Sequence, residues 1–280
     1  MRCLPLLLVA VVACATPTNH PGTVDAPGET DSGEPDGAQQ NPDASMPDAP
    51  TPPTITVLRG VDRASVFSLT EAQGLNTNHG VKWTGVYIGG PCNGGSGWTK
   101  SIVTMLNSQL GWAFMPIYVG QQSPSICGAS TLTAAQGTID GNAAAGHMAS
   151  FGWQPNNNIP VCLDLEAGSY SYSPSGSLAY AKAWRDAVRA AGYLAYLYSN
   201  PTALDALYDA NVKFDGAWPA SWFYSQFTAV APEDLTQLGS RYTNKNRAWQ
   251  YGNFNVSGAG NVDGDSSDLL LAPAPGGTNL

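Results

Sequence analysis

From residue 54 onward the chain alternates short runs rich in β-branched and aromatic residues with segments of helical periodicity. This alternation is typical of βα units, in which helices join parallel strands, rather than of a sandwich. The predicted strands are residues 56–62, 84–90, 113–120, 159–166, 193–199, 214–220, 247–252 and 261–265. Eight strands with helices between most of them predict an α/β fold of the (β/α)8-type, that is, a TIM-like barrel.

The segments between the strands carry the signals of helices. The first has an N-cap candidate in Thr99 and a terminal glycine in Gly111. The predicted helices are residues 99–111, 133–152, 175–192 and 201–210. The later connections are too short for full helices, so we expect an irregular barrel.

An open doubly wound sheet is the main alternative fold. Such sheets commonly bind nucleotides through a glycine-rich loop after a strand. The glycine-rich segment GGPCNGGSG, residues 89–97, lacks the Lys-Ser/Thr pair of a phosphate-binding loop, and no G-x-G-x-x-G follows a strand. The barrel is therefore preferred, with residues 89–97 as a loop at its rim.

The N-terminal part of the chain has the composition of a targeting segment followed by a tether. Residues 1–14 hold one positive charge and an apolar run that is too short to span a bilayer and is typical of a signal peptide. The sequence VVAC resembles a bacterial lipobox and predicts a lipid anchor on Cys14, with ordinary secretory cleavage nearby as the alternative. Residues 15–53 are acidic, rich in proline and almost without aliphatic or aromatic side chains, which predicts a disordered linker before a domain at 54–280.

These features predict an exported protein that is anchored by lipid in the bacterial envelope. No Asp follows Cys14, and this absence resembles the signal for sorting to the outer membrane. The formal net charge of -9 is concentrated in residues 15–53, which contain seven acidic and no basic residues. The remaining domain has a net charge of only -3, which argues against a nucleic-acid partner.

The fourth predicted strand, IPVCLDLE, carries two carboxylates in an otherwise apolar run. Alternate residues of a strand share a face, so Asp164 and Glu166 lie on one face while Val161, Leu163 and Leu165 lie on the other. If the apolar face packs against helices, the acids project into the mouth of the barrel, where barrel active sites lie. Their mutual repulsion would leave one acid protonated beside an ionised one, as glycoside hydrolysis requires. Surface acids and helix caps can also have this D-x-E spacing.

Further acids and aromatic residues recur at the predicted strand ends. The acids are Asp62, Asp263 and Asp265. Aromatic rings at such positions can stack on sugar rings, and core packing is the alternative for each of them. The candidates for substrate binding are Tyr87, Tyr118, Tyr198, Trp218, Trp222, Trp249 and Tyr251.

The order of these motifs resembles a bacterial glycoside-hydrolase-like domain family, which is akin to the lysozyme-type muramidases of glycoside hydrolase family twenty-five. The resemblance covers essentially all of residues 54–280. Its most specific part is the combination of PIYVGQQ, the D-x-E strand and WQY, and it extends over GVDRAS, YIGGPC, GYLAYLYSN, FDGAWPASW and NVDGDSSDLL.

The resemblance implies roles for the acids. Glu166 would be the proton donor, Asp164 the stabilising or orienting carboxylate, and Asp62 a site acid on the first strand. The late acid would be Asp263 or Asp265, and we expect only one of these two to point inward from a regular strand.

The resemblance also implies a β-1,4-linked N-acetylated glycan, such as peptidoglycan, as the substrate. The expected function is therefore that of a muramidase-like glycoside hydrolase. A barrel that binds cell-wall or surface polysaccharide without cleaving it is one alternative. A structural envelope lipoprotein that docks a protein partner, with its mouth plugged by loops, is another.

The cysteines of the domain indicate one disulfide. Cys92 and Cys127 follow the second and third predicted strands, and adjacent parallel strands would bring them together in a compartment that permits disulfides. Cys162 shares the face of the two acids and is expected to be a small buried residue rather than a nucleophile. The histidines lack zinc-binding spacing, so the sequence predicts no metal site and no cofactor.

Overall fold

The computed structural model describes residues 56–122, 127–128, 131–155, 158–166, 176–230, 241–242 and 247–276. The predicted signal peptide, the lipidation site Cys14 and the linker of residues 15–53 lie outside the described residues. Among the helices that are described, none has the length and apolar character needed to cross a bilayer.

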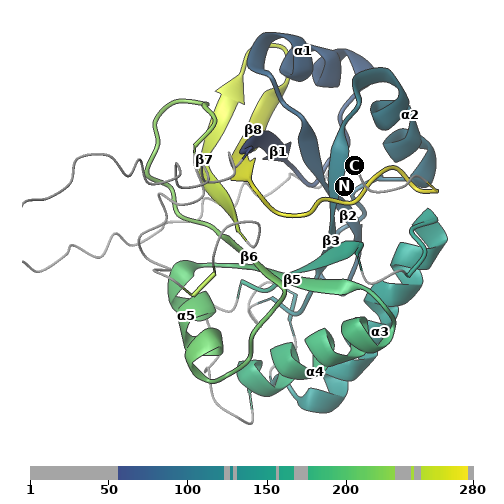
Figure 1. The fold of residues 1–280 in the computed structure, drawn as a ribbon, viewed down its shortest axis with the longest axis vertical. Helices are drawn as coiled ribbons and strands as arrows, with labels where there is room; N and C mark the ends of the chain where they lie inside the picture. Colours follow the sequence, from purple (N-terminus) through teal and green to yellow (C-terminus); the bar gives the residue numbers. More distant parts are fainter. Residues whose placement is uncertain are drawn as a thin grey trace, which may run out of the picture. The chain divides into compact units, whose positions relative to one another are not determined.

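Eight strands form one sheet that nearly closes into a barrel (Figure 1). They are β1 (Leu58–Asp62), β2 (Trp83–Gly89), β3 (Ala113–Val119), β4 (Pro160–Asp164), β5 (Leu194–Ser199), β6 (Gly216–Pro219), β7 (Ala248–Val256) and β8 (Gly260–Ser267). The order is β6-β5-β4-β3-β2-β1-β8-β7. All eight strands lie where the sequence predicts them.

The two halves of the barrel are built differently. Strands β1 to β6 pair in parallel, whereas β8 is antiparallel to both β1 and β7. Two isolated parallel bridges, Ala217 to Arg247 and Ala220 to Gln250, join β6 to β7 and bring the ends of the sheet together. The predicted α/β barrel with irregular late connections is therefore confirmed.

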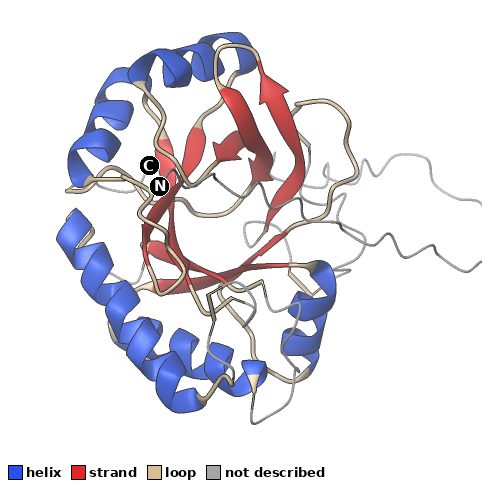
Figure 2. Cartoon of the chain, turned by 180° about the vertical axis from the view of Figure 1, so that it is seen from behind, coloured by secondary structure: helices blue, strands red, loops and turns tan. Residues whose placement is uncertain are grey.

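Five helices cover the outside of the strands (Figure 2). They are α1 (Leu69–His79), α2 (Lys100–Leu110), α3 (Ala134–Phe151), α4 (Ser177–Ala190) and α5 (Pro201–Asp209). Side chains cap the N-termini of three of the predicted helices, because Thr99, Thr133 and Asn200 each accept a hydrogen bond from a backbone N–H of the first turn.

Helix α1 was not among the predicted helices. It buries only Ala72 and Leu75 and so has little apolar periodicity. Its sequence signal is a capping box instead. The Ser68 hydroxyl accepts from the Glu71 N–H, and the Glu71 carboxylate accepts from the Ser68 N–H.

Two apolar clusters pack on opposite sides of the sheet. The outer cluster lies between strands and helices and includes Val161, Leu163 and Leu165. The inner cluster fills the barrel and includes Cys162 together with Trp83 and Trp218, whose rings meet edge to face at 5.4 Å between centroids. This packed interior closes the barrel below the mouth.

Candidate active site

A cavity of about 210 Å³ opens at the carboxyl ends of the parallel strands. This is the end of a barrel at which enzymes of this architecture place their active sites. The lining residues are Asp62, Tyr87, Ile117, Asp164, Glu166, Tyr198, Trp218, Gln250 and Asp263. This set includes four carboxylates and no Lys or Arg, so the cavity attracts positive charge and can hold protons.

The β4 acids lie on the predicted face. Asp164 closes β4 and Glu166 follows it, and both line the cavity. Cys162 of the same face packs inside the barrel, whereas Val161 and Leu163 pack outward. Asp164 is half-buried and Glu166 is exposed, so Glu166 is the acid that incoming molecules meet first.

The environment of the β4 acids favours protonation. Burial raises the pKa of Asp164 well above its ordinary value, the charge of Glu166 adds to this, and a hydrogen bond from Gln122 opposes it. Partial desolvation raises the pKa of Glu166, the charge of Asp263 adds to this, and the Tyr198 hydroxyl opposes it. A carboxyl with a raised pKa can deliver a proton closer to neutral pH.

Asp62, at the end of β1, is almost fully buried beneath the mouth. The Tyr87 hydroxyl donates to its Oδ1 at 2.6 Å, and the Gln250 side-chain amide donates to its Oδ2 at 3.3 Å. Burial, followed by the charge of Asp263, raises the pKa of Asp62 to about 7, although the Tyr87 hydrogen bond lowers it. Space for Asp62 depends on Gly85, since an added Cβ there would lie 2.7 Å from the Asp62 Cβ.

Gln250 links the buried acid to the rim of the cavity. Its Oε1 accepts from the Tyr198 hydroxyl at 2.8 Å and from the Trp222 indole N–H at 3.2 Å. Its Nε2 is the group that donates to Asp62. These three bonds fix the Gln250 amide and tie the exposed Trp222 to the cavity wall.

Asp263 and Asp265 both point into the barrel, so the expectation that only one of them faces inward is wrong. Residues two apart on a strand share a face, so Asp263 and Asp265 lie on the same face of β8. Asp263 pairs with Asp62 across β1 and β8, which places this face inward. Asp263 lines the cavity and accepts from Asn253 at 2.8 Å. Asp265 is fully buried deeper in the barrel, where the Trp218 indole N–H donates to it at 3.0 Å.

The surroundings of Asp263 and Asp265 raise the pKa of both carboxyls. Burial raises the pKa of Asp265 well above its ordinary value, and the charges of Asp62 and Asp263 add to this. Burial also raises the pKa of Asp263, while its Asn253 hydrogen bond opposes the shift. All five acids of this end of the barrel therefore bind protons more tightly than exposed carboxyls do.

The predicted aromatic residues divide between the cavity and the outer core. Those that line the cavity are Tyr87, Tyr198 and Trp218. Those that pack in the outer cluster are Tyr118, Trp249 and Tyr251. Tyr118 follows Ile117, which lines the cavity, so strand alternation turns the Tyr118 ring toward Trp184 of α4.

Trp222 takes an intermediate position at the rim. It is 61% exposed, and its indole N–H bonds Gln250 of the cavity wall. An exposed indole at the mouth of an acid cavity suits contact with a flat or apolar ligand face.

The predicted disulfide between Cys92 and Cys127 is confirmed, with 5.6 Å between the two Cα atoms. Cys162 is a free, buried cysteine inside the barrel, as expected from its strand face. Among the described residues, no group of three or more His, Cys, Asp or Glu side chains is arranged to hold a metal ion.

Two glutamines of the site were not singled out from the sequence, although both lie in quoted motifs. Gln122 ends PIYVGQQ, and its side-chain amide contacts the backbone and side chain of the β4 acids. Gln250 lies in WQY, where it shares the inward face with Ala248. The face of Gln250 follows from alternation, whereas the contact of Gln122 depends on how the chain leaves β3.

The fold and the acid-lined mouth define a glycoside hydrolase-like barrel. Residues 73–267 match the profile of the Rv2525c-like, glycoside hydrolase-like domain family, and the chain belongs to this family. The matched segment contains every lining residue of the cavity except Asp62. A comparison with curated proteins found no match.

Solved structures with the same fold come from bacteria and a bacteriophage. An uncharacterized B. stearothermophilus protein is 21% identical with a TM-score of 0.51, covering 74% of this chain and 94% of that one. The catalytic domain of endolysin ply40 from bacteriophage P40 of Listeria monocytogenes is 14% identical with a TM-score of 0.50, and the match covers 76% of this chain and 93% of the endolysin domain. The modular autolysin LytC from Streptococcus pneumoniae is 16% identical with a TM-score of 0.52, and the match covers 75% of this chain and 46% of the autolysin chain. At these identities the likeness is one of fold.

Proposed function

We propose that this protein is an exported, lipid-anchored glycoside hydrolase that cleaves β-1,4 bonds of an N-acetylated cell-wall glycan such as peptidoglycan. The observation that carries the proposal is the cavity at the barrel mouth, where Glu166 is exposed beside Asp164, Asp62 and Asp263. The fold that this chain shares with an endolysin catalytic domain and an autolysin supports a cell-wall substrate.

In this proposal Glu166 donates a proton to the glycosidic oxygen. Its exposure gives it access to the leaving group, and its raised pKa favours the protonated form that a proton donor needs. Asp164 orients the reacting ring and stabilises positive charge at the anomeric carbon. When ionised, Asp62 and Asp263 add negative potential from the β1 and β8 side, and none of the described residues that line the cavity is a Lys or Arg.

The aromatic groups and the N-terminus complete the proposal. Tyr87, Tyr198 and Trp218 would contact the sugar inside the cavity, while Trp222 would stack on a ring at the rim. The lipid on Cys14 and the linker of residues 15–53 would hold the domain at the outer membrane within reach of the wall.

Release of new reducing ends from purified peptidoglycan tests the proposal. The wild-type protein should release them, Glu166→Gln should lose about a hundredfold to ten-thousandfold in rate, and the surface variant Asp209→Asn should match the wild type. Asp209 on α5 is a suitable control because it is an exposed carboxylate whose side chain bonds Arg241 and does not line the cavity.

A polysaccharide-binding barrel without hydrolytic activity gives a different result in the same experiment. Neither the wild type nor Glu166→Gln would then release reducing ends from peptidoglycan or from other glycans, while both would sediment with one of them. That outcome would reject the catalytic roles and keep the glycan site.

A further inference from the structure

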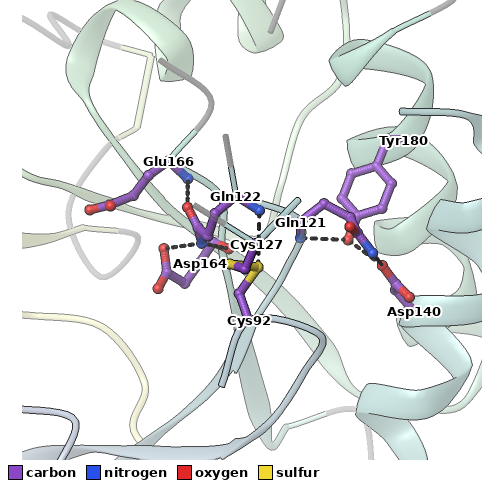
Figure 3. The surroundings of a disulfide bond; sticks show 8 residues. All are labelled: Cys92, Gln121, Gln122, Cys127, Asp140, Asp164, Glu166 and Tyr180. Atoms are coloured by element: carbon purple, nitrogen blue, oxygen red, sulfur yellow. Dashed lines mark hydrogen bonds between the residues drawn. A yellow bond between two sulfur atoms is a disulfide. The ribbon is translucent and has the colours of Figure 1, made fainter. Parts of the chain in front are cut away.

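The side chain of Gln122 returns from the end of β3 to the acid-bearing strand (Figure 3). Its Nε2 donates to the Asp164 carbonyl oxygen at 3.1 Å and to the Asp164 Oδ1 at 3.2 Å. Its Oε1 accepts from the Glu166 backbone N–H at 3.0 Å. Both donors and the acceptor of one amide are therefore directed to the two proposed catalytic acids.

The hydrogen bonds of Gln122 resemble those that a neighbouring strand makes in a sheet. In a parallel sheet, one residue of a strand donates its N–H to a carbonyl on the neighbouring strand, and its own carbonyl accepts from an N–H two residues further along that neighbour. The Gln122 amide makes these two bonds to the Asp164 carbonyl and the Glu166 N–H. It thus occupies the place of a backbone partner opposite Leu165, whose own N–H pairs on the other side with the Tyr198 carbonyl at 3.1 Å.

The backbone that follows β3 makes one of these two bonds, and the Gln122 Oε1 takes the other, from the Glu166 N–H. The register of β3 with β4 ends at Val119 and Asp164, after which the Gly120 N–H makes one more bond to the Asp164 carbonyl at 2.9 Å. Gly120 lies so close to β4 that an added Cβ would be 2.6 Å from the Leu163 Cδ1. Beyond Gly120 the chain turns away from the sheet.

Hydrogen bonds of Gln121 and Gln122 hold the chain away from the sheet. The Gln121 N–H donates to the Tyr180 hydroxyl at 3.4 Å, and the Gln121 side chain donates to Asp140 at 3.1 Å, which places this residue against α3 and α4 (Figure 3). The Gln122 N–H donates to the Cys92 sulfur of the disulfide at 3.4 Å. These bonds hold the backbone of Gln121 and Gln122 away from β4, and the Gln122 Oε1 supplies the acceptor for the Glu166 N–H.

We propose that Gln122 is a positioning residue, which extends the β3–β4 ladder with its side-chain amide and thereby holds Asp164 and Glu166 on one face of β4. The Cys92–Cys127 disulfide and the Asp140–Tyr180 pair anchor the backbone from which Gln122 reaches back. The effect of Gln122 on catalysis rests on the proposed hydrolase function, whereas the ladder extension does not depend on it.

Hydrogen exchange of single amides tests the ladder extension directly. In Gln122→Leu, the Glu166 N–H loses its acceptor and should exchange at least tenfold faster, while the Leu165 N–H keeps the Tyr198 carbonyl and should stay protected. Gln122→Asn should behave in the same way, because its amide is one methylene too short to reach. The matched control is Gln109→Leu, which makes the same replacement at an exposed position on α2.

Kinetics on peptidoglycan test the positioning role. We expect Gln122→Leu and Gln122→Asn to lower kcat at least tenfold with little change in KM, since the acids and not the sugar contacts are displaced. Gln122→Glu keeps the Oε1 acceptor but donates to Asp164 only when protonated, so it should recover activity at acidic pH alone. The control Gln109→Leu should keep the wild-type pH profile.

The outcomes separate the two proposals. If the Glu166 N–H exchanged at the same rate in Gln122→Leu and in the wild type, the ladder extension would be overturned. It would also be overturned if the Leu165 N–H exchanged faster in Gln122→Leu by the same factor as the Glu166 N–H. Unchanged kcat in Gln122→Leu, with an active wild type, would overturn the positioning role. Selective acceleration at Glu166 in a wild-type protein that cleaves no glycan would keep the ladder extension and reject the proposed function.

Discussion

Two pairs of acids occupy the same end of the barrel in contrasting environments. The mouth pair, Asp164 and Glu166, extends from a parallel strand and reaches solvent, where Gln122 holds it. The deep pair, Asp62 and Asp265, lies between the antiparallel β1 and β8, and its exposed fractions are 2% and 0%. Carboxyl groups therefore occur in two settings: the mouth pair can meet a substrate, whereas burial of the deep pair favours its protonated form.

The largest difference between the pairs is expected in catalysis. Asp164→Asn removes a carboxylate that faces the cavity and should lower kcat about a hundredfold or more. Asp265→Asn keeps the oxygen that accepts from Trp218 and should lower kcat tenfold or less. Initial rates of reducing-end release compare the two, and a larger loss in Asp265→Asn would reverse the assignment of the pairs.

The next effect concerns the dependence of stability on pH. The ordinary Asp pKa is 3.8 and the pKa of Asp62 is about 7, so between these values the folded protein keeps a proton that the unfolded chain has released. Stability therefore falls as pH rises through this window, and Asp62→Asn removes the fall. The variant should gain up to about 4 kcal/mol in free energy of unfolding at pH 8 and nothing at pH 3.

Urea unfolding at several pH values measures this gain. The surface variant Asp209→Asn should follow the wild type throughout. A gain of the same size in Asp62→Asn at pH 3 and pH 8 would show that packing, rather than the buried charge, is responsible.

A smaller expected effect is that of Asp263, on the β8 side of the cavity, on the pKa of Glu166, on the β4 side. The negative charge of Asp263 raises the pKa of Glu166, so Asp263→Asn should lower that pKa and the proton donor should be lost at lower pH. We expect the alkaline limb of the pH–rate profile to move down by about half to one pH unit. An upward movement would mean that Asp263 acts on Glu166 other than through its charge.

The smallest expected effect is on the pKa of Asp62 in the deep pair. Tyr87→Phe removes the hydroxyl that donates to Asp62 at 2.6 Å and should raise the Asp62 pKa above 7 by about one unit. Tyr118→Phe is the matched control, because its ring packs under the helices. Carbon-13 titration of the Asp62 carboxyl measures both, and the same shift in the two variants would count against the Tyr87 bond.

The sequence predicted those features that depend on strand periodicity. The eight strands and the inward face of Asp164 and Glu166 follow from the alternation of side chains in a strand. The same rule applies to Asp263 and Asp265, and the error there lay in treating residues two apart as opposite. Tyr118 shows the limit of composition, since an aromatic residue at a strand end fits the core as well as the site.

Other features depended on tertiary contacts. Helix α1 buries too few apolar residues for periodicity to reveal it, although its capping box at Ser68 was readable. The role of Gln122 could not be predicted, because it arises only where the backbone leaves β3 toward Tyr180 and Cys92. Gln250 likewise meets Asp62 only through closure of the barrel.

Titration of the five site carboxyls in the wild-type protein by carbon-13 NMR tests the account most directly. We expect Asp62 to titrate near pH 7, Asp265 to keep its proton well above the ordinary range, and Glu166 to titrate above 4.5. Ordinary values for all five, with every carboxyl ionised by pH 5, would contradict an account in which Glu166 delivers a proton at the mouth and the deep pair retains its protons.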